Sequence, residues 1–326
     1  MPMSLSPWVA TCVFGLGLVV GSFLNVVIAR VPAGESIVSP RSRCPRCGHP
    51  LAWFENIPLL SWLVLRARCR ACRATISARY PAVELLTGFL FLGCWLRFGM
   101  SWGLLRGLLL VGFLVPLTFI DLEHWLLPFE LTLPGLALGV LSAIPLGWDA
   151  LRDAAGGAAA AFLFFWGLEV AAPFLVGVVR WVLALVRWAV HLGRRVLGNQ
   201  GLAAQEFPKV SVPKEALGGG DKWLLALLGA FLGWQPLFGL LLLSSVQGMV
   251  VSVGLLLAHG RAAPPPVPVA DAAAGPESDD FESGPTHLPF GPWLALAGLE
   301  LMLLGPVLEQ FLPAPLARML TGGLGA

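Results

Sequence analysis

Eight long apolar segments recur along the chain, and they restrict its fold more than any other feature of the sequence. They lie at about 8–28, 82–99, 103–120, 131–147, 155–175, 216–234, 236–258 and 290–311. A helix needs about 20 apolar residues to cross a bilayer, and lipid cannot hydrogen-bond the open edges of a β-sheet. The sequence therefore predicts an all-α polytopic integral membrane protein with about eight transmembrane helices embedded in the lipid bilayer.

The overall composition supports a membrane protein. Charged residues make up 12% of the 326 residues, whereas soluble domains carry about 25%. This composition excludes an ordinary soluble enzyme, a disordered chain and a coiled coil. The net charge of +2 gives no indication of a nucleic-acid partner. The N-terminus lacks a basic segment and an obvious cleavage site, so the first apolar segment is expected to be a retained span.

The basic residues are distributed unevenly between the two sides of the predicted bundle. Seventeen of the 21 lysines and arginines fall in or beside three large loops, at 30–80, 176–215 and 261–288. With eight spans, all three loops lie on one side of the membrane. Because loops rich in Lys and Arg stay in the cytoplasm, we expect these loops inside the cell and both termini outside.

Four of the six cysteines form two CxxC pairs in the first large loop, at Cys44, Cys47, Cys69 and Cys72. Each pair places two thiolates on one tight turn, and two such turns complete the tetrahedron that a structural Zn²⁺ prefers. Thiols stay reduced in the cytosol, which agrees with the side assigned to this loop. The sequence thus predicts a small cytoplasmic zinc ribbon-like domain. Free thiols or a redox pair are the alternative.

Two later segments have distinct patterns. Residues 176–197 carry five basic side chains within about 100° of a helical wheel, which favours an amphipathic helix on the cytoplasmic membrane surface. A cytoplasmic extension of the fifth span is the alternative. Residues 261–285 are rich in Pro, Ala and acidic residues, a composition typical of a disordered linker.

Two aspartates end up at the cytoplasmic membrane boundary in this topology. Asp121 closes the third apolar segment, and Asp221 follows Gly218, Gly219 and Gly220 at the start of the sixth. Two carboxylates that share a site cannot both ionise easily, so one keeps a proton. Such a pair supplies a general base and a general acid for hydrolysis. The alternative is that both aspartates merely end or cap helices.

Other acidic residues also lie in apolar segments, so the aspartates are not the only candidates for an intramembrane role. These residues are Glu84, Glu169, Glu300 and Glu309. A membrane carrier that relays protons along such acids and holds a structural zinc is the alternative to an enzyme. A peptidase explains better why two acids sit beside glycines at one membrane face.

The order of motifs resembles the type IV prepilin peptidases, which are GxGD-type aspartic membrane proteases. The resemblance is carried by Gly21–Arg30, by the segment from Cys44 through Tyr80-Pro81 to Glu84, by Phe119-Ile120-Asp121, by Glu215–Asp221 and by Leu288–Pro292. It covers about half of the chain, in order. Two positions depart from the family pattern. Trp223 stands where a lysine is usual, with Lys222 before it. Phe129 stands where the family's Leu-Pro-Asp motif has its aspartate, after Leu127 and Pro128.

The resemblance implies a bifunctional enzyme. It would cleave the basic leader from prepilins of type IV pili and pseudopilins of type II secretion at the cytoplasmic face of the bacterial inner membrane. It would then N-methylate the new N-terminus with S-adenosylmethionine, for which residues 30–80 are the candidate region. Asp121 and Asp221 would be catalytic, Gly218 and Gly220 would contact the substrate, and Cys44, Cys47, Cys69 and Cys72 would hold the metal.

The expected domain boundaries follow from these assignments. They are a first transmembrane helix at 1–29, a cytoplasmic zinc-binding domain at 30–80, a membrane aspartic peptidase core at 81–258 with a cytoplasmic amphipathic insertion at 176–215, a disordered linker at 259–288, and a last transmembrane helix with its tail at 289–326.

Overall fold

The computed structural model describes residues 6–196, 219–259 and 289–321, and the regular secondary structure in these ranges is helical apart from two isolated β-bridges in the loop between α1 and α3. The helices are α1 (Pro7–Arg30), η1 (Trp53–Asn56), α2 (Leu60–Val64), α3 (Arg79–Phe98), α4 (Trp102–His124), α5 (Phe129–Leu141), η2 (Ile144–Leu146), α6 (Trp148–Val196), α7 (Asp221–Leu232), α8 (Leu237–His259), α9 (Gly291–Phe311) and α10 (Ala314–Thr321). The predicted all-α fold is confirmed. The predicted linker at 261–285 lies outside the described residues.

Seven described segments are long and apolar enough to cross a membrane. They contain α1, α3, α4, α5 with η2, the first part of α6, α8 and α9. The sixth expected span corresponds to α7, whose 12 described residues extend for only about 18 Å. Every residue of α7 from Leu224 to Leu232 is buried. The helix is therefore enclosed by the bundle, packed against α5, α6 and α9.

Small residues bring pairs of helices into close contact. A Cβ added at Gly17 of α1 would lie 2.7 Å from the Cα of Gly88 in α3, and one added at Gly21 would lie 2.8 Å from the Cα of Glu84. Gly157 of α6 and Gly229 of α7 meet in the same way. Glycines at helix contacts let backbones approach in lipid, where packing drives association.

Arg106 ties the ends of three helices together. Its guanidinium donates to the carbonyl oxygens of Gly139 and Phe231, at 3.4 and 2.9 Å, and to the hydroxyl of Ser142 at 3.0 Å. These carbonyls belong to the last turns of α5 and α7, where helices leave acceptors without partners. Arg106 of α4 therefore fixes the end of α7 that lies opposite Asp221.

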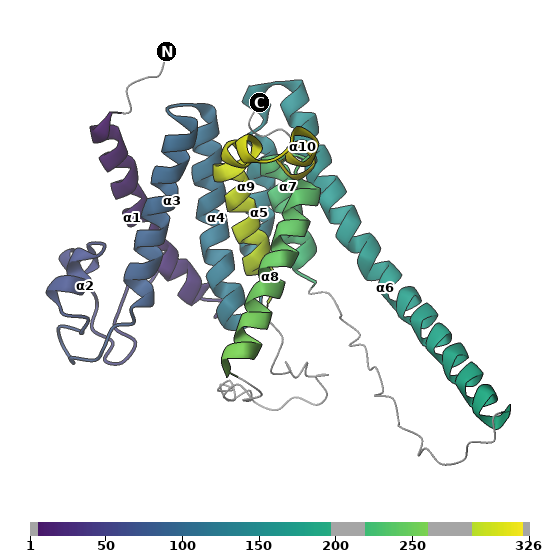
Figure 1. Ribbon diagram of the computed structural model, residues 1–326. Coiled ribbons are helices and arrows are strands. Elements are labelled where there is room, and N and C mark those ends of the chain that lie inside the picture. The colour runs from purple at the N-terminus through teal and green to yellow at the C-terminus, as the bar shows by residue number, and fades with distance from the viewer. Residues whose placement is uncertain (1–5, 197–218, 260–288, 322–326) are drawn as a thin grey trace.

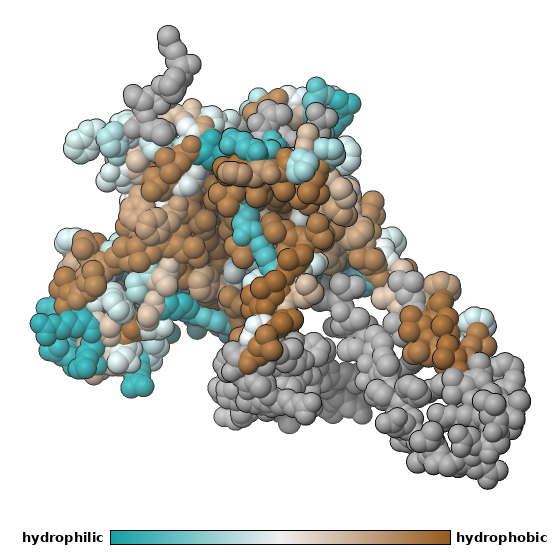
Figure 2. Space-filling view, in the orientation of Figure 1, coloured by the Kyte–Doolittle hydropathy of each residue, from teal (hydrophilic) through white to brown (hydrophobic). Residues whose placement is uncertain are grey.

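Helix α6 runs without a break for 49 residues and projects away from the bundle (Figure 1). The sequence left two arrangements open for residues 176–197, and the continuous helix to Val196 corresponds to an extension of the fifth span. Figure 2 shows a wide apolar surface over the helices and a polar surface on the loop domain below α1 and α3.

The loop domain between α1 and α3 lies at one end of the bundle, whereas α1 begins and α9 ends at the other (Figure 1). Glu84 of α3 attaches this domain to the membrane helices, because its carboxylate accepts a hydrogen bond of 2.8 Å from the N–H of Leu59. Asn25 of α1 donates to the carbonyl of Tyr80 at 3.1 Å. The loop domain is thus fixed to α3, and α1 and α3 are joined to each other where the loop domain emerges from them.

Candidate active site and metal centre

Asp121 lies in the last turn of α4, where its side chain is only 5% exposed. The helix ends because Trp125 adopts a left-handed conformation with φ 55°, and the Trp125 N–H donates to the Asp121 carbonyl at 2.9 Å. The chain then turns through Leu127 and Pro128 into α5. This turn sets the Asp121 carboxylate inside the bundle instead of at its surface.

Asp221 is the first residue of α7, and its side chain is 8% exposed. The preceding Gly220 packs against the turn that follows α4, since a Cβ at this position would lie 2.7 Å from the Cβ of Leu127. Glycine at 220 therefore allows α7 to begin beside the end of α4. Gly219 has open space around it, and Gly218 lies outside the described residues.

The two carboxylates are neighbours. The negative charge of Asp121 acts on Asp221, so the two carboxylates lie close together. The backbone of Gly291, the first residue of α9, packs against the Asp121 carboxylate, because a Cβ added there would overlap its Oδ2 atom. The Asp121 Oδ2 atom is buried and has no hydrogen-bond partner among the described residues. An acceptor in this state is ready to hold a proton or a water molecule.

Gly291 is a residue of this site whose role the sequence did not show. A Cβ added to it would overlap the Oδ2 atom of Asp121, so any larger residue would displace the carboxylate. The sequence signal was the Gly291-Pro292 pair at the start of an apolar segment, which predicts a helix start. Nothing in this pattern indicates which side chain the glycine meets.

The other acidic residues of the membrane helices have partners of their own. Glu84 accepts from the Leu59 N–H, Glu169 pairs with Lys222 at 2.7 Å, Glu300 accepts from Gln247, and Glu309 accepts from Thr321. Within the described residues, Asp121 and Asp221 are therefore the buried acids that face each other. Of the acids considered in the sequence, they best fit proton transfer.

The two departures from the family pattern also have defined contacts. The ring of Trp223 lies 5.8 Å from that of Phe129 and 4.8 Å from that of Phe162. Lys222, in turn, reaches α6 through its ion pair with Glu169. Phe129 and Trp223 thus form one aromatic contact between α5 and α7, so the two departures compensate each other by packing.

The four loop cysteines come together as the sequence predicted. All four Sγ atoms lie within 4.8 Å of one another, with 3.9 Å between Cys44 and Cys72 and 4.0 Å between Cys47 and Cys69. A zinc ion with Zn–S bonds of about 2.3 Å requires tetrahedral S···S edges of about 3.8 Å. Four cysteine thiols at these distances fit a closed, structural zinc site.

Backbone amides of the two CxxC turns favour the thiolate form of the first cysteine in each pair. The N–H groups of Cys47 and Arg46 lower the pKa of Cys44 to about 7, and those of Cys72 and Ala71 lower the pKa of Cys69. The turn backbone is therefore the main cause of these lowered pKa values.

The two CxxC turns repeat one local structure. Cys44 N–H bonds to the His49 carbonyl at 2.9 Å, and Cys69 N–H bonds to the Ala74 carbonyl at 2.8 Å. The residue four places after each of these cysteines has a positive φ, 71° at Gly48 and 61° at Arg73. Glycine adopts this conformation freely, whereas arginine is strained by it.

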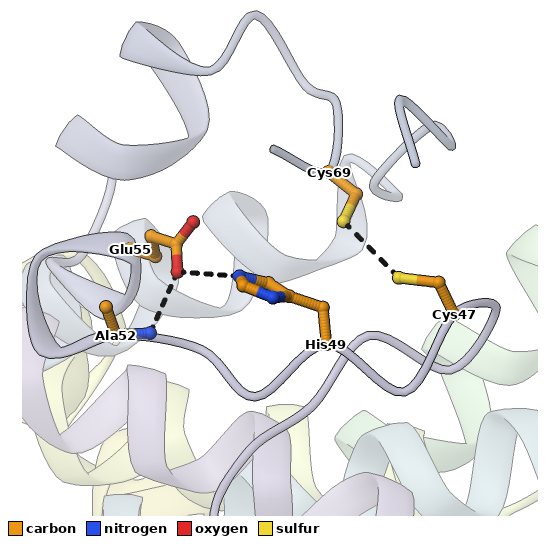
Figure 3. A network of polar contacts seen from close by, with 5 residues as sticks. All are labelled: Cys47, His49, Ala52, Glu55 and Cys69. Atoms are coloured by element: carbon orange, nitrogen blue, oxygen red, sulfur yellow. Dashed lines mark hydrogen bonds and ion pairs between the residues drawn. The ribbon is translucent and has the colours of Figure 1, made fainter. Parts of the chain in front are cut away.

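A buried polar network supports the first turn (Figure 3). The Oε2 atom of Glu55 accepts a hydrogen bond of 2.8 Å from the Ala52 N–H and lies 3.3 Å from His49 Nε2. The Ala52 N–H, followed by His49, holds the pKa of the Glu55 carboxyl below its usual value. His49 follows Cys47 by two residues, so this network fixes the loop that carries the first cysteine pair.

A cavity of about 470 Å³ lies between α1 and the loop domain. It is lined by one face of α1, including Ser22, Phe23 and Arg30, and by Arg41 and Trp53 of the loop domain. Trp53 is 75% exposed. Cavities of this size accommodate small molecules, and this one is separate from the residues around Asp121.

The fold and the paired buried carboxylates define a class: a polytopic helical membrane protein with a four-cysteine loop domain and an aspartate pair at the same end of the bundle. Two family profiles match the chain, the bacterial peptidase A24 N-terminal domain over residues 16–98 and the type IV leader peptidase family over residues 108–253. The chain belongs to this family of A24 aspartic peptidases, the prepilin leader peptidase/N-methyltransferases.

Relatives in several bacteria support this assignment over nearly the full length. A prepilin leader peptidase/N-methyltransferase of Myxococcus xanthus (strain DK1622) is 48% identical, and the match covers 99% of this chain and 98% of the relative. The Aeromonas hydrophila protein of the same name is 38% identical, with 94% of each chain covered. That of Pseudomonas aeruginosa is 35% identical, with 90% of each covered. No solved structure matches the chain.

Proposed function

We propose that this protein removes the leader peptide from type IV prepilins and type II secretion pseudopilins and N-methylates the new N-terminus. The observation that carries the peptidase part is the buried pair of Asp121 and Asp221 on two different helices. The names of its relatives, which cover nearly the whole chain, support both activities.

The carboxylate pair divides the work of amide hydrolysis. One carboxylate takes a proton from a water molecule while the other, protonated, donates its proton to the scissile carbonyl oxygen. The water oxygen bonds to the carbonyl carbon, and the resulting tetrahedral intermediate collapses by breaking the C–N bond. The amine leaves with a proton from the pair. A hydroxyl group of the intermediate returns its proton to the pair as the carbonyl re-forms, so the pair ends, as it began, with one shared proton. The unpartnered Asp121 Oδ2 is a place for that proton or for the water.

The active site is proposed to face the cytoplasm at the bacterial inner membrane. Asp121, Gly220 and Gly291 lie at helix ends on the side of the bundle that carries the loop domain. That side also carries most of the basic loops, and such loops stay in the cytoplasm. The mature part of a prepilin remains in the bilayer in this arrangement, and its leader reaches the carboxylates from the cytoplasm.

The methyl donor is proposed to be S-adenosylmethionine, which supplies an electrophilic methyl group. The cavity between α1 and the loop domain fits such a ligand in size and chemistry. Arg30 and Arg41 suit its carboxylate, and the Trp53 ring suits its adenine or sulfonium group. On the protein side, these residues would bind and orient the donor. The four cysteines hold a structural Zn²⁺ that keeps this domain folded.

Co-expression with a type IV prepilin tests the proposal. The expected product is a shortened pilin whose N-terminal residue carries one additional methyl group, measured by mass spectrometry of the N-terminal peptide. A proton-relaying carrier would leave the prepilin at full length. An unshortened prepilin, with both proteins present in the membrane, would reject the peptidase function.

A further inference from the structure

An apolar groove of about 280 Å³ lies beside the aspartate pair on the outside of the bundle. Three helices form it: α3 contributes Leu86 and Leu90, α4 contributes Val115 and Phe119, and α9 contributes Leu296 and Leu303. Its surface is almost entirely apolar, and its polar lining residues are Thr118 and Glu300, whose carboxylate accepts a hydrogen bond from Gln247 of α8. Leu86 and Leu296 remain about 40% exposed, so the groove is open to the surrounding lipid.

The groove starts at the catalytic end of the bundle. Pro292, which lines it, directly follows Gly291, whose backbone packs against the Asp121 carboxylate. Phe119 lies two residues before Asp121 on α4. From these residues the lining extends along α9 to Leu304, which is about 18 Å of helix. This length is more than half of the hydrocarbon thickness of about 30 Å.

The far end of the groove is closed by contact between two of its walls. A Cβ added at Gly93 of α3 would lie 3.5 Å from Leu303 of α9, so these helices are in contact there. The groove therefore narrows at Leu303, and its other end lies at Pro292.

We propose that this groove binds the hydrophobic helix of the substrate immediately after the scissile bond. The inference rests on the proposed peptidase function. A hydrophobic helix that stays in the bilayer must place its cytoplasmic end at Asp121 and Asp221, and the groove begins at Pro292, the residue after the glycine that packs against Asp121. In this arrangement, a few side chains of the docked helix insert into the groove between side chains of α3, α4 and α9. Substrate selection then depends on apolar packing in the membrane as well as on the leader.

Photo-crosslinking tests the location. Leu296 is replaced by p-benzoylphenylalanine in an Asp221→Asn enzyme that holds uncleaved prepilin, and Leu242 of α8 is replaced in the same way as a control. Leu242 is 44% exposed and does not line the groove. The expected result is a crosslink from position 296 to the hydrophobic helix and none from position 242. Crosslinks from 296 to phospholipid alone, or equal yields at both positions, would overturn the proposal.

The second measurement is the cleavage kinetics of variants in which a tryptophan side chain fills the groove. Leu296→Trp and Leu303→Trp are expected to raise KM for prepilin about tenfold, because apolar contacts worth about one buried side chain are lost, with kcat unchanged. Leu242→Trp is expected to leave both constants unchanged. If the wild type cleaves prepilin and all three variants behave alike, the groove is not the docking site. If the wild type does not cleave, the proposed function fails instead.

Discussion

Replacing Asp121 by asparagine separates a catalytic role from a structural one. Asparagine keeps the size of the side chain, but it cannot transfer a proton. Proton transfer by one positioned group is worth about 10²–10⁴ in rate. Because the pair works as a unit, we expect cleavage to fall by about 10³–10⁴, which is about 4–5.5 kcal/mol in activation free energy. The Asp121→Asn, Asp221→Asn double variant should lose little more.

The Asp121→Asn variant should lose activity but not stability. A buried acceptor without a partner costs about 1–3 kcal/mol, and Oδ2 of Asp121 is such an acceptor. An asparagine Nδ2 in its place can donate to Asp221 and removes the repulsion between two carboxylates. The unfolding temperature in detergent should therefore be equal to or higher than that of the wild type.

The assay is single-turnover cleavage of purified prepilin, followed by mass spectrometry of the product. Glu123→Gln is the control, since Glu123 pairs with Arg79 and not with Asp221. The wild-type rate should show a bell-shaped pH dependence that belongs to the pair and not to either residue alone. Cleavage by Asp121→Asn within tenfold of the wild-type rate, at equal protein level, would show that the carboxylates are structural.

The remaining predictions concern the loop domain and the topology. Cys72→Ser should lose zinc and then protein, because metal binding and folding of this domain are coupled; bound zinc at the wild-type ratio, measured by metal analysis, would contradict the site. Arg73→Gly should raise the free energy of unfolding of the loop domain by about 1 kcal/mol, since glycine relieves the strain at φ 61°; chemical denaturation measures it, and a lower value would refute the strain argument. Reporter fusions at Ala67 should read cytoplasmic and those at Gly147 external, and the reverse at either would reject the proposed orientation.

Local patterns in the sequence predicted a large part of this structure. Helix positions follow from runs of about 20 apolar residues, and two CxxC pairs in one loop predict a single four-thiolate site. Asp121 and Asp221 could be selected because charged residues at the ends of apolar segments are uncommon and costly. Each of these inferences uses neighbours in the chain.

Contacts between distant segments could not be predicted in the same way. Arg106 is one of the few basic residues that lie away from the three large loops, yet it is half-buried and binds the last carbonyls of α5 and α7. Gly291 contacts Asp121, which lies 170 residues earlier in the chain. A single sequence does not show that two such distant residues are in contact. The burial of α7 also depends on where α5, α6 and α9 pack, which hydropathy alone does not determine.

The enclosure of α7 has a consequence for how the protein is made. This helix is too short to cross the bilayer alone and is surrounded by protein from Leu224 to Leu232. During membrane insertion, α7 is therefore enclosed only after α5 and α6 have been inserted and α9 has then packed against it. Asp221 thus reaches Asp121 at a late stage of biogenesis, after most of the chain has been synthesised. A ribosome-bound chain that lacks α9 is expected to be inert, which delays proteolytic activity until assembly is nearly complete.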